Sequence, residues 1–302
     1  MKISFVSVVT TLVTVAQAHT YLSHLTIAGT RHPEGECLEP YPKLRNRPVL
    51  FVDSSDLTCG LNRTKSASVK SCPVQAGTDV IAEWHHNNDS PSDDVISASH
   101  KGPCIFYMAP AASDGKGDVW FKIFEDGYDP STKTWCINKL RDNKGKIAVK
   151  IPPSLKPGDY LLRGEVIALH NADAIHTENP KRGAQFYVHC GHITVTGGGS
   201  EVPKGHAIPG VYKYTDPGVH FNVHKPFSEY VIPGPPVCAG GTSNSKGTTG
   251  QTKPSKSQAS SAPKSTSYAA SSAPAKTSGA KTKTRVKTKH SKTRNPSSYQ
   301  TV

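Results

Sequence analysis

One histidine of this chain gains special ligand chemistry from its position. Lys2, a mostly apolar run over 3–16 and then Ala16-Gln17-Ala18 form the pattern of a secretory signal peptide with its cleavage site. A first core strand would be the alternative reading of this run, but the cleavage pattern follows it at once. Cleavage after Ala18 would make His19 the first residue, with an α-amine and an imidazole placed to chelate one metal ion. The α-amine has an ordinary pKa of roughly 7.7 to 8.0, so a metal can displace its proton at mild pH. A second imidazole would complete a planar three-nitrogen site, which suits Cu(II).

Short strands are the elements that must position such a site. Segments that alternate apolar and polar residues, or run apolar for five or six positions, lie between Gly, Pro, Asn and Asp residues, as in 80–84, 104–108, 119–124, 146–151, 160–168 and 185–195. This spacing predicts an all-β sandwich with long loops. Helical periodicity of any length is missing, so we expect only short helices inside loops such as 171–182.

The segment that begins at Ala184 carries polar side chains at alternate positions. A period of two places Phe186, Val188 and Cys190 on one face, which we expect to be core. Gln185, Tyr187 and His189 then form a polar row on the other face. From the spacing alone, this row could equally be an ordinary solvent-facing edge.

Five separated motifs give the chain a family resemblance. They are His19-Thr20, Ser99-His100-Lys101-Gly102-Pro103, Ile167-Ala168-Leu169-His170, Gly183-Ala184-Gln185-Phe186-Tyr187 and Tyr230-Val231-Ile232-Pro233-Gly234-Pro235-Pro236. In this order, from His19 to about Cys238, they resemble the fungal lytic polysaccharide monooxygenases of auxiliary activity family nine. The resemblance implies an immunoglobulin-like or fibronectin-like β-sandwich with a flat face around one copper ion.

The resemblance also implies a role for each matched residue. His19 would bind copper through its amine and its ring, His100 would bind it through its ring, and together they would form a histidine brace. Tyr187 would lie near the axial position of the copper. His170 and Gln185 would donate hydrogen bonds to the oxygen species, as groups around a metal ligand often do. The polar row that alternation predicts contains both Gln185 and Tyr187.

The implied reaction is oxidative cleavage of β-1,4-glucan chains. An external electron donor would reduce the copper, and dioxygen or hydrogen peroxide would be the co-substrate. The expected substrates are cellulose and cello-oligosaccharides, with hemicellulose as a further candidate, and the most similar family members suggest attack at carbon four. The expected sugar contacts are His86, Asn87, Asp173, Arg182 and His224. His224 stands where relatives often carry a stacking Tyr, which puts strong binding to crystalline cellulose in doubt.

Seven cysteines in a secreted chain predict disulfide bonds with one cysteine left over. The resemblance implies a bridge between Cys59 and Cys190. A free thiol beside copper would be a redox hazard, so we expect Cys104 to be buried or bridged. The pairing of the other cysteines stays open; these are Cys37, Cys72, Cys136 and Cys238. Asn62 and Asn88 begin glycosylation acceptor sequences in polar stretches.

Composition divides the chain into a signal peptide at 1–18, a catalytic domain at 19–238 and a tail at 239–302. Twelve of the 36 Lys and Arg residues lie in the tail, whereas none of the 23 Asp and Glu residues does. The domain is therefore near neutral, which argues against nucleic-acid binding. The tail is rich in Ser, Thr, Lys and Pro, which predicts disorder. It has no cysteine and only Tyr268 and Tyr299 as aromatics, so we expect no carbohydrate-binding module there.

We therefore expect a secreted, monomeric enzyme without a membrane segment, because no later stretch is apolar for long enough to span a bilayer. A glycoside hydrolase with paired carboxylates is one alternative, but it would leave the histidine brace unexplained. The other is a non-catalytic extracellular protein of the same fold that binds copper or cell wall. That protein would be expected to lose His19, His170, Gln185 or Tyr187, and all four are present.

Overall fold

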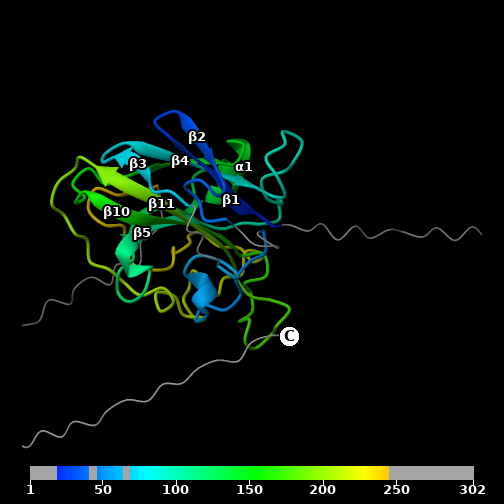
Figure 1. Cartoon of the computed structure of the whole chain (residues 1–302). Coiled ribbons are helices and arrows are strands. Elements are labelled where there is room, and N and C mark those ends of the chain that lie inside the picture. The colour runs from blue at the N-terminus through cyan, green and yellow to red at the C-terminus, as the bar shows by residue number, and fades with distance from the viewer. Residues whose placement is uncertain (1–18, 41–45, 64–68, 245–302) are drawn as a thin grey trace, which may run out of the picture. The chain divides into compact units, whose positions relative to one another are not determined.

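The computed structural model describes residues 19–40, 46–63 and 69–244, and it shows two β-sheets that face each other (Figure 1). The predicted signal peptide and most of the predicted tail lie outside the described residues. The four-stranded sheet has the order β2 (Thr30–Pro33), β1 (Tyr21–Ile27), β4 (Asp79–His85) and β9 (Lys146–Lys150). The six-stranded sheet has the order β12 (Thr242–Ser243), β6 (Phe121–Asp126), β5 (Cys104–Pro110), β10 (Gly158–Ala168), β11 (Gln185–Thr196) and β3 (Cys72–Gln75).

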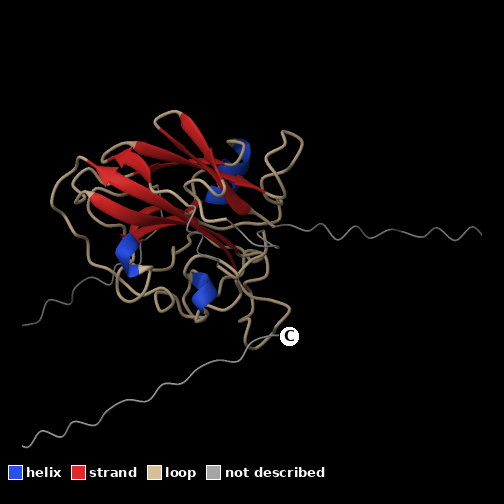
Figure 2. Ribbon diagram, viewed as in Figure 1, coloured by secondary structure: helices blue, strands red, loops and turns tan. Residues whose placement is uncertain are grey.

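The remaining regular elements are short and lie among long loops (Figure 2). They are a ribbon of β7 (Tyr128–Asp129) and β8 (Thr134–Trp135), the helix α1 (Cys136–Asp142) and two 3-10 turns, η1 (Ser55–Leu57) and η2 (Ala111–Ser113). The predicted all-β sandwich with long loops is thus confirmed. Among the described residues, no helix is long and apolar enough to cross a membrane.

All six predicted strand segments form strands, but the expected helix lies elsewhere. The loop 171–182 contains turns and no helix, whereas α1 follows β8 directly. The Asn138 side chain accepts a hydrogen bond from the backbone amide of Trp135 at 2.9 Å and so caps the first turn of α1. Strand β1 was not predicted because its register shifts between Leu22 and His24, which breaks the alternation of its side chains.

Strand β11 is buried on both of its faces. Phe186, Val188 and Cys190 pack in a cluster between the six-stranded sheet and the long loops, as the alternation predicts. Tyr187 lies on the other face, in the core between the two sheets, with 1% of its surface exposed. His189 is equally buried, and its Nε2 lies 2.7 Å from the backbone oxygen of Glu39. The solvent-facing reading of the polar row is therefore wrong, because the second sheet covers that face.

Three disulfide bonds are present, two of which join a loop to a strand and one of which joins β5 to α1. The expected bridge between Cys59 and Cys190 is confirmed. The two pairs that the sequence left open are Cys37 with Cys72 and Cys104 with Cys136. Cys104 is therefore both buried and bridged, and Cys238 carries the free thiol among the described cysteines.

A fully buried ion pair lies in the cluster under the long loops. The guanidinium of Arg163 and the carboxylate of Glu165 are 2.8 Å apart, and neither side chain is exposed. Arg163 also donates hydrogen bonds to the backbone oxygens of Leu57 and Thr58. The hydroxyl of Tyr212 donates to the other carboxylate oxygen at 2.5 Å. The charges are thus paired and hydrogen-bonded, as burial at this depth requires, although Nη1 of Arg163 has no hydrogen-bond partner among the described residues.

The described fold continues past the predicted domain boundary at Cys238. Strand β12 pairs in parallel with β6, with Thr242 opposite Phe124. The carboxylate of Glu125 accepts a hydrogen bond from the Ser243 hydroxyl at 2.9 Å. The backbone oxygen of Glu125 accepts a second one from the amide of Asn244, also at 2.9 Å. Residues 239–244 therefore belong to the sandwich.

Candidate functional site

His19 lies where the described chain enters β1. The next residue fixes this position, because the hydroxyl of Thr20 donates hydrogen bonds to the backbone oxygens of His85 at 3.2 Å and Val95 at 2.8 Å. The Nδ1 atom of His19 is buried and has no hydrogen-bond partner among the described residues. Burial, with smaller contributions from His86 and Arg47, lowers the pKa of His19. Its imidazole is therefore neutral at mild pH, which is the form that binds metals.

His100 reaches the site through the segment that leads into β5. This segment runs beside the end of β10, where the amide of Leu169 donates to the backbone oxygen of Lys101 at 2.8 Å. A Cβ atom on Gly102 would lie 1.8 Å from the backbone oxygen of Ile167, so only glycine allows this approach. The contact places the His100 ring against the His170 ring, with centroids 4.1 Å apart and planes 29° apart.

Tyr187 lies near both predicted ligand histidines. Its ring centroid is 6.5 Å from that of His19 and 6.0 Å from that of His100. The Nε2 atom of His100 lies 3.2 Å from the phenol oxygen, and the phenol donates a hydrogen bond to Oε1 of Gln185 at 2.8 Å. Burial raises the pKa of Tyr187 well above its ordinary value, so the phenol keeps its proton.

His170 completes the group at the end of β10. Burial is the largest cause that lowers the pKa of His170, and His224 and Arg182 add to it. The Nδ1 atom of His170 is buried without a hydrogen-bond partner among the described residues. The fold thus brings together His19, His100, His170, Gln185 and Tyr187, from segments far apart in the sequence.

These residues fit the copper ion that the family resemblance implies. The rings of His19 and His100 both lie near that of Tyr187, and the Nδ1 of His19 is a buried nitrogen that nothing in the described protein satisfies. Nitrogen donors of this kind suit copper, although imidazole also binds other divalent transition metals. The third nitrogen would be the α-amine of His19, which becomes free only after cleavage at Ala18.

Three of the five predicted sugar contacts lie around His170. The carboxylate of Asp173 forms an ion pair with the guanidinium of Arg182. The Nε2 atom of His224 lies 2.8 Å from the backbone oxygen of His170. His224 is exposed, whereas Asp173 and Arg182 are partly exposed, so all three could meet a ligand at this surface.

The other two predicted contacts lie in the loop after β4. His86 is close enough to His19 to affect its pKa, and its Nδ1 lies 2.6 Å from a carboxylate oxygen of Asp94. The side chain of Asn87 donates a hydrogen bond to the carboxylate of Asp93 at 3.1 Å. The structure therefore brings His86 close to His19, whereas Asn87 contacts Asp93 within its loop and accepts a hydrogen bond from the side chain of Asn46.

Sequence reasoning missed the segment that covers the other side of His19. The amide of Val49 donates to the backbone oxygen of Phe186 at 2.8 Å, and this bridge places 47–50 beside the start of β11. A cavity of about 450 Å³ lies there and is lined by His19, Arg47, Pro48, Leu50, Leu61 and Gln185. No sequence signal marks Arg47, Pro48 and Leu50, because their chemistry is ordinary and only the bridge at Val49 brings their segment to His19.

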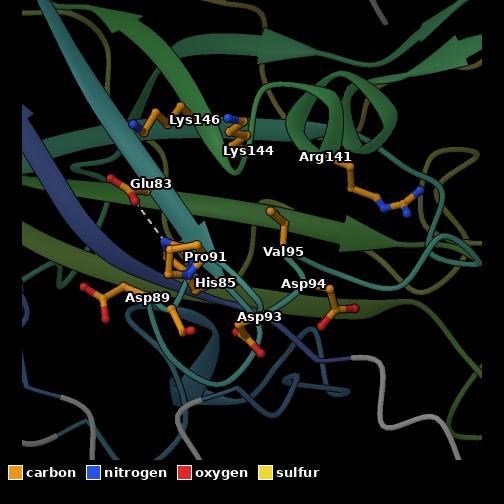
Figure 3. A pocket seen from close by; sticks show the side chains of 11 residues that line it. Glu83, His85, Asp89, Pro91, Asp93, Asp94, Val95, Arg141, Lys144 and Lys146 are labelled. Carbon is orange, nitrogen blue, oxygen red and sulfur yellow. Dashed lines mark hydrogen bonds and ion pairs between the residues drawn. The ribbon is translucent and has the colours of Figure 1, made fainter.

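A second cavity, of about 500 Å³, contains none of the predicted site residues (Figure 3). Donor atoms of His24, Glu83 and His85 lie within 4.8 Å of one another at its edge, which is a spacing that could suit a metal ion. However, the guanidinium of Arg31 donates to both carboxylate oxygens of Glu83 at 3.0 Å. The positively charged guanidinium of Arg31 already occupies the carboxylate of this cluster, which disfavours the binding of a metal ion there.

Comparison with known proteins gives consistent matches. A model of Auxiliary Activity family 9 (formerly GH61) matches residues 19–230. A relative from Aspergillus clavatus, named AA9 family lytic polysaccharide monooxygenase A, is 42% identical over 228 residues. That match covers 74% of this chain and 62% of the relative, so the chain spans less than two thirds of its length.

Two solved structures share the fold of this chain. The first, named CvAA9A, has a TM-score of 0.68 at 35% identity and covers 74% of this chain and 100% of its own. The second is described as a cellulose-active polysaccharide monooxygenase from M. thermophila, with a TM-score of 0.59 at 31% identity and coverage of 74% and 100%. Both identities are high enough to argue for more than a shared fold.

Proposed function

Because the chain belongs to Auxiliary Activity family 9, we propose that it is a copper-dependent lytic polysaccharide monooxygenase, an oxidoreductase that cleaves polysaccharide chains oxidatively. The observation that carries the proposal is the buried, unpartnered Nδ1 of His19 beside the pair of His100 and Tyr187. A glycoside hydrolase would need two carboxylates at the reaction centre. The residues grouped here are imidazoles, an amide and a phenol.

Each residue of the group has a role that its contacts support. His19 would hold copper through its α-amine and Nδ1, and His100 through Nε2. Bound copper supplies electron transfer and the activation of the oxygen co-substrate. The phenol of Tyr187 remains protonated and donates to the carbonyl oxygen of Gln185. The amide nitrogen of Gln185 is therefore left as a donor toward the co-substrate.

The neutral ring of His170 would supply a second hydrogen bond to the co-substrate. Its pKa is lowered, so at mild pH it carries one ring proton that it can donate without bringing in a full charge. The two donors would orient the co-substrate for attack on a glycosidic carbon. In this proposal the protein contributes mainly orientation and protection.

The substrate, localisation and assembly are parts of the same proposal. The substrate is a β-1,4-glucan, either cellulose or cello-oligosaccharides, with attack at carbon four, and a flat surface around His19 would receive it. The solved relative from M. thermophila is described as cellulose-active. The co-substrate is dioxygen or hydrogen peroxide, and an external reductant supplies electrons. The protein is secreted and acts as a monomer.

Mass spectrometry of the products tests this function. Correctly processed, copper-loaded protein is incubated with cellulose and with cello-oligosaccharides, with and without ascorbate. Ascorbate-dependent oxidised oligosaccharides are expected from the wild type and from the control His32→Ala, but not from His100→Ala. The mass and hydration pattern of these products identifies the oxidised carbon. Tight copper binding without oxidised products on any β-glucan would instead support the non-catalytic alternative.

A further inference from the structure

The turn that begins at His170 has an unusual set of hydrogen bonds. Its four consecutive backbone oxygens, from His170 to Asp173, all accept bonds from outside the turn. The amide of Gly183 donates to Asn171 at 2.8 Å, and the amide of Phe221 donates to Ala172 at 2.8 Å. The two outer oxygens are bonded by side chains. Nε2 of His224 lies 2.8 Å from the backbone oxygen of His170, and Nε2 of His220 lies 3.2 Å from the backbone oxygen of Asp173.

The chemistry of these contacts fixes the proton positions on both histidine rings. A backbone oxygen can only accept a hydrogen bond, so the Nε2 atoms of His220 and His224 must carry the protons. Each ring therefore acts as a donor whether it is neutral or charged.

The two histidines belong to one well-anchored loop, residues 216–225. Val219 and Val223 are buried in the cluster beneath the loop and Phe221 packs against the same cluster, whereas the side chain of His220 is exposed. The phenol of Tyr230 donates to the backbone oxygen of Gly218 at 2.6 Å. Within the loop, the Asn222 side chain accepts a bond from the amide of His224 at 2.9 Å. The loop is thus held in place independently of the turn that it contacts.

We propose that the 216–225 loop is a positioning element for His170, and that His224 acts through the backbone oxygen of His170 in addition to any contact with sugar. The His170 ring stacks on the ring of His100 at 4.1 Å. A shift of the backbone at His170 therefore moves the His170 ring relative to His100, the predicted copper ligand. The consequence for turnover rests on the proposed function, whereas the effect on the position of the ring does not.

Substitutions at His224 separate the positioning role from sugar stacking. His224→Phe keeps a flat ring but removes the donor, and His224→Gln keeps a donor but removes the ring. Lys225→Ala is the matched control, because this exposed neighbour contributes no side chain to the turn. In metal-free, correctly processed protein, histidine-ring NMR signals report the environment of His170 directly. His224→Phe is expected to shift the ring signals of His170 and His100, whereas His224→Gln and Lys225→Ala are expected to leave them near their wild-type positions.

Kinetics on copper-loaded protein give the second readout. Loss of an outer hydrogen bond to a metal site typically costs about 10- to 100-fold in activity, so kcat of His224→Phe should fall roughly tenfold while its copper affinity stays unchanged. Unchanged ring signals, with only a raised KM for oligosaccharide, would overturn the proposal and leave His224 as a sugar contact. If His224→Phe does not fold, His220→Phe tests the other side-chain donor in the same way. A wild type that makes no oxidised products would refute the proposed function but not the NMR result.

Discussion

Removing one partner of the buried Arg163 and Glu165 pair should destabilise the protein strongly. The two charged groups lie 2.8 Å apart with no exposed surface. At an effective dielectric constant of about 20, their Coulomb attraction is about 6 kcal/mol, which is an upper limit because desolvation opposes it. Truncation of a buried pair typically costs about 3–5 kcal/mol, since an uncompensated charge remains. We expect Arg163→Met to lower the free energy of unfolding by this amount.

Urea unfolding followed by circular dichroism at pH 7 and 25 °C, with all disulfides intact, measures this change. The double variant Arg163→Met with Glu165→Gln removes both charges but keeps an acceptor for the hydroxyl of Tyr212. It should recover about 2 kcal/mol of the loss, because no unpaired charge remains. The reasoning would be refuted if Arg163→Met cost less than about 1 kcal/mol, or if the double variant were no more stable than the single one.

Three further predictions concern copper binding, a disulfide and pH. One extra residue ahead of His19 converts its α-amine into an amide, so copper affinity measured by calorimetry should fall at least about 100-fold, or about 2.7 kcal/mol; equal affinity would contradict the brace. Replacing Cys104 and Cys136 by Ala opens a loop with a sequence separation of 32 and should lower the free energy of unfolding by about 3.7 kcal/mol in the chain-entropy description. Burial alone would raise the pKa of Glu83, but hydrogen bonds from Arg31 and His85, together with the charges of Arg31 and Lys146, outweigh burial and lower the pKa from 4.5 to about 2. The stability that this carboxylate contributes is therefore fully present above about pH 4.5 and is lost as pH falls toward 2. Glu83→Gln should flatten the decrease of Tm over that pH range. An unchanged slope would show that the ion pair of Glu83 with Arg31 does not contribute to stability.

The strands that were predicted correctly share a regular pattern of side chains. β10 and β11 are mostly apolar segments bounded by turn residues, with β-branched and aromatic residues frequent in β11, and this pattern located both strands. The strands that were missed break this pattern. β1 contains a register shift. β3 is a short edge strand that contains Pro73, and an edge strand tolerates proline because its backbone nitrogen need not donate a hydrogen bond to a neighbouring strand.

Prediction of the site was limited in a different way. The motifs pointed to His19, His100 and Tyr187 as residue types with the right chemistry, but they contain no distances. The approach of the Gly102 segment to β10 brings His100 onto the ring of His170, and this contact joins two loops of the folded chain. The role of His224 could not be predicted either, because its partner is a backbone oxygen, a group that every residue carries.

The sequence by itself determined what depends on neighbouring residues: the strand periodicity, the polar row that contains Gln185 and Tyr187, the cleavage pattern before His19 and the composition of the tail. Only the tertiary structure decided which cysteines pair, that both faces of β11 are buried, and that the 216–225 loop holds the turn at His170. The reason is physical. Periodicity follows from the geometry of the backbone over a few residues, whereas contacts such as that of His100 with Tyr187, 87 residues apart, depend on how the whole chain packs.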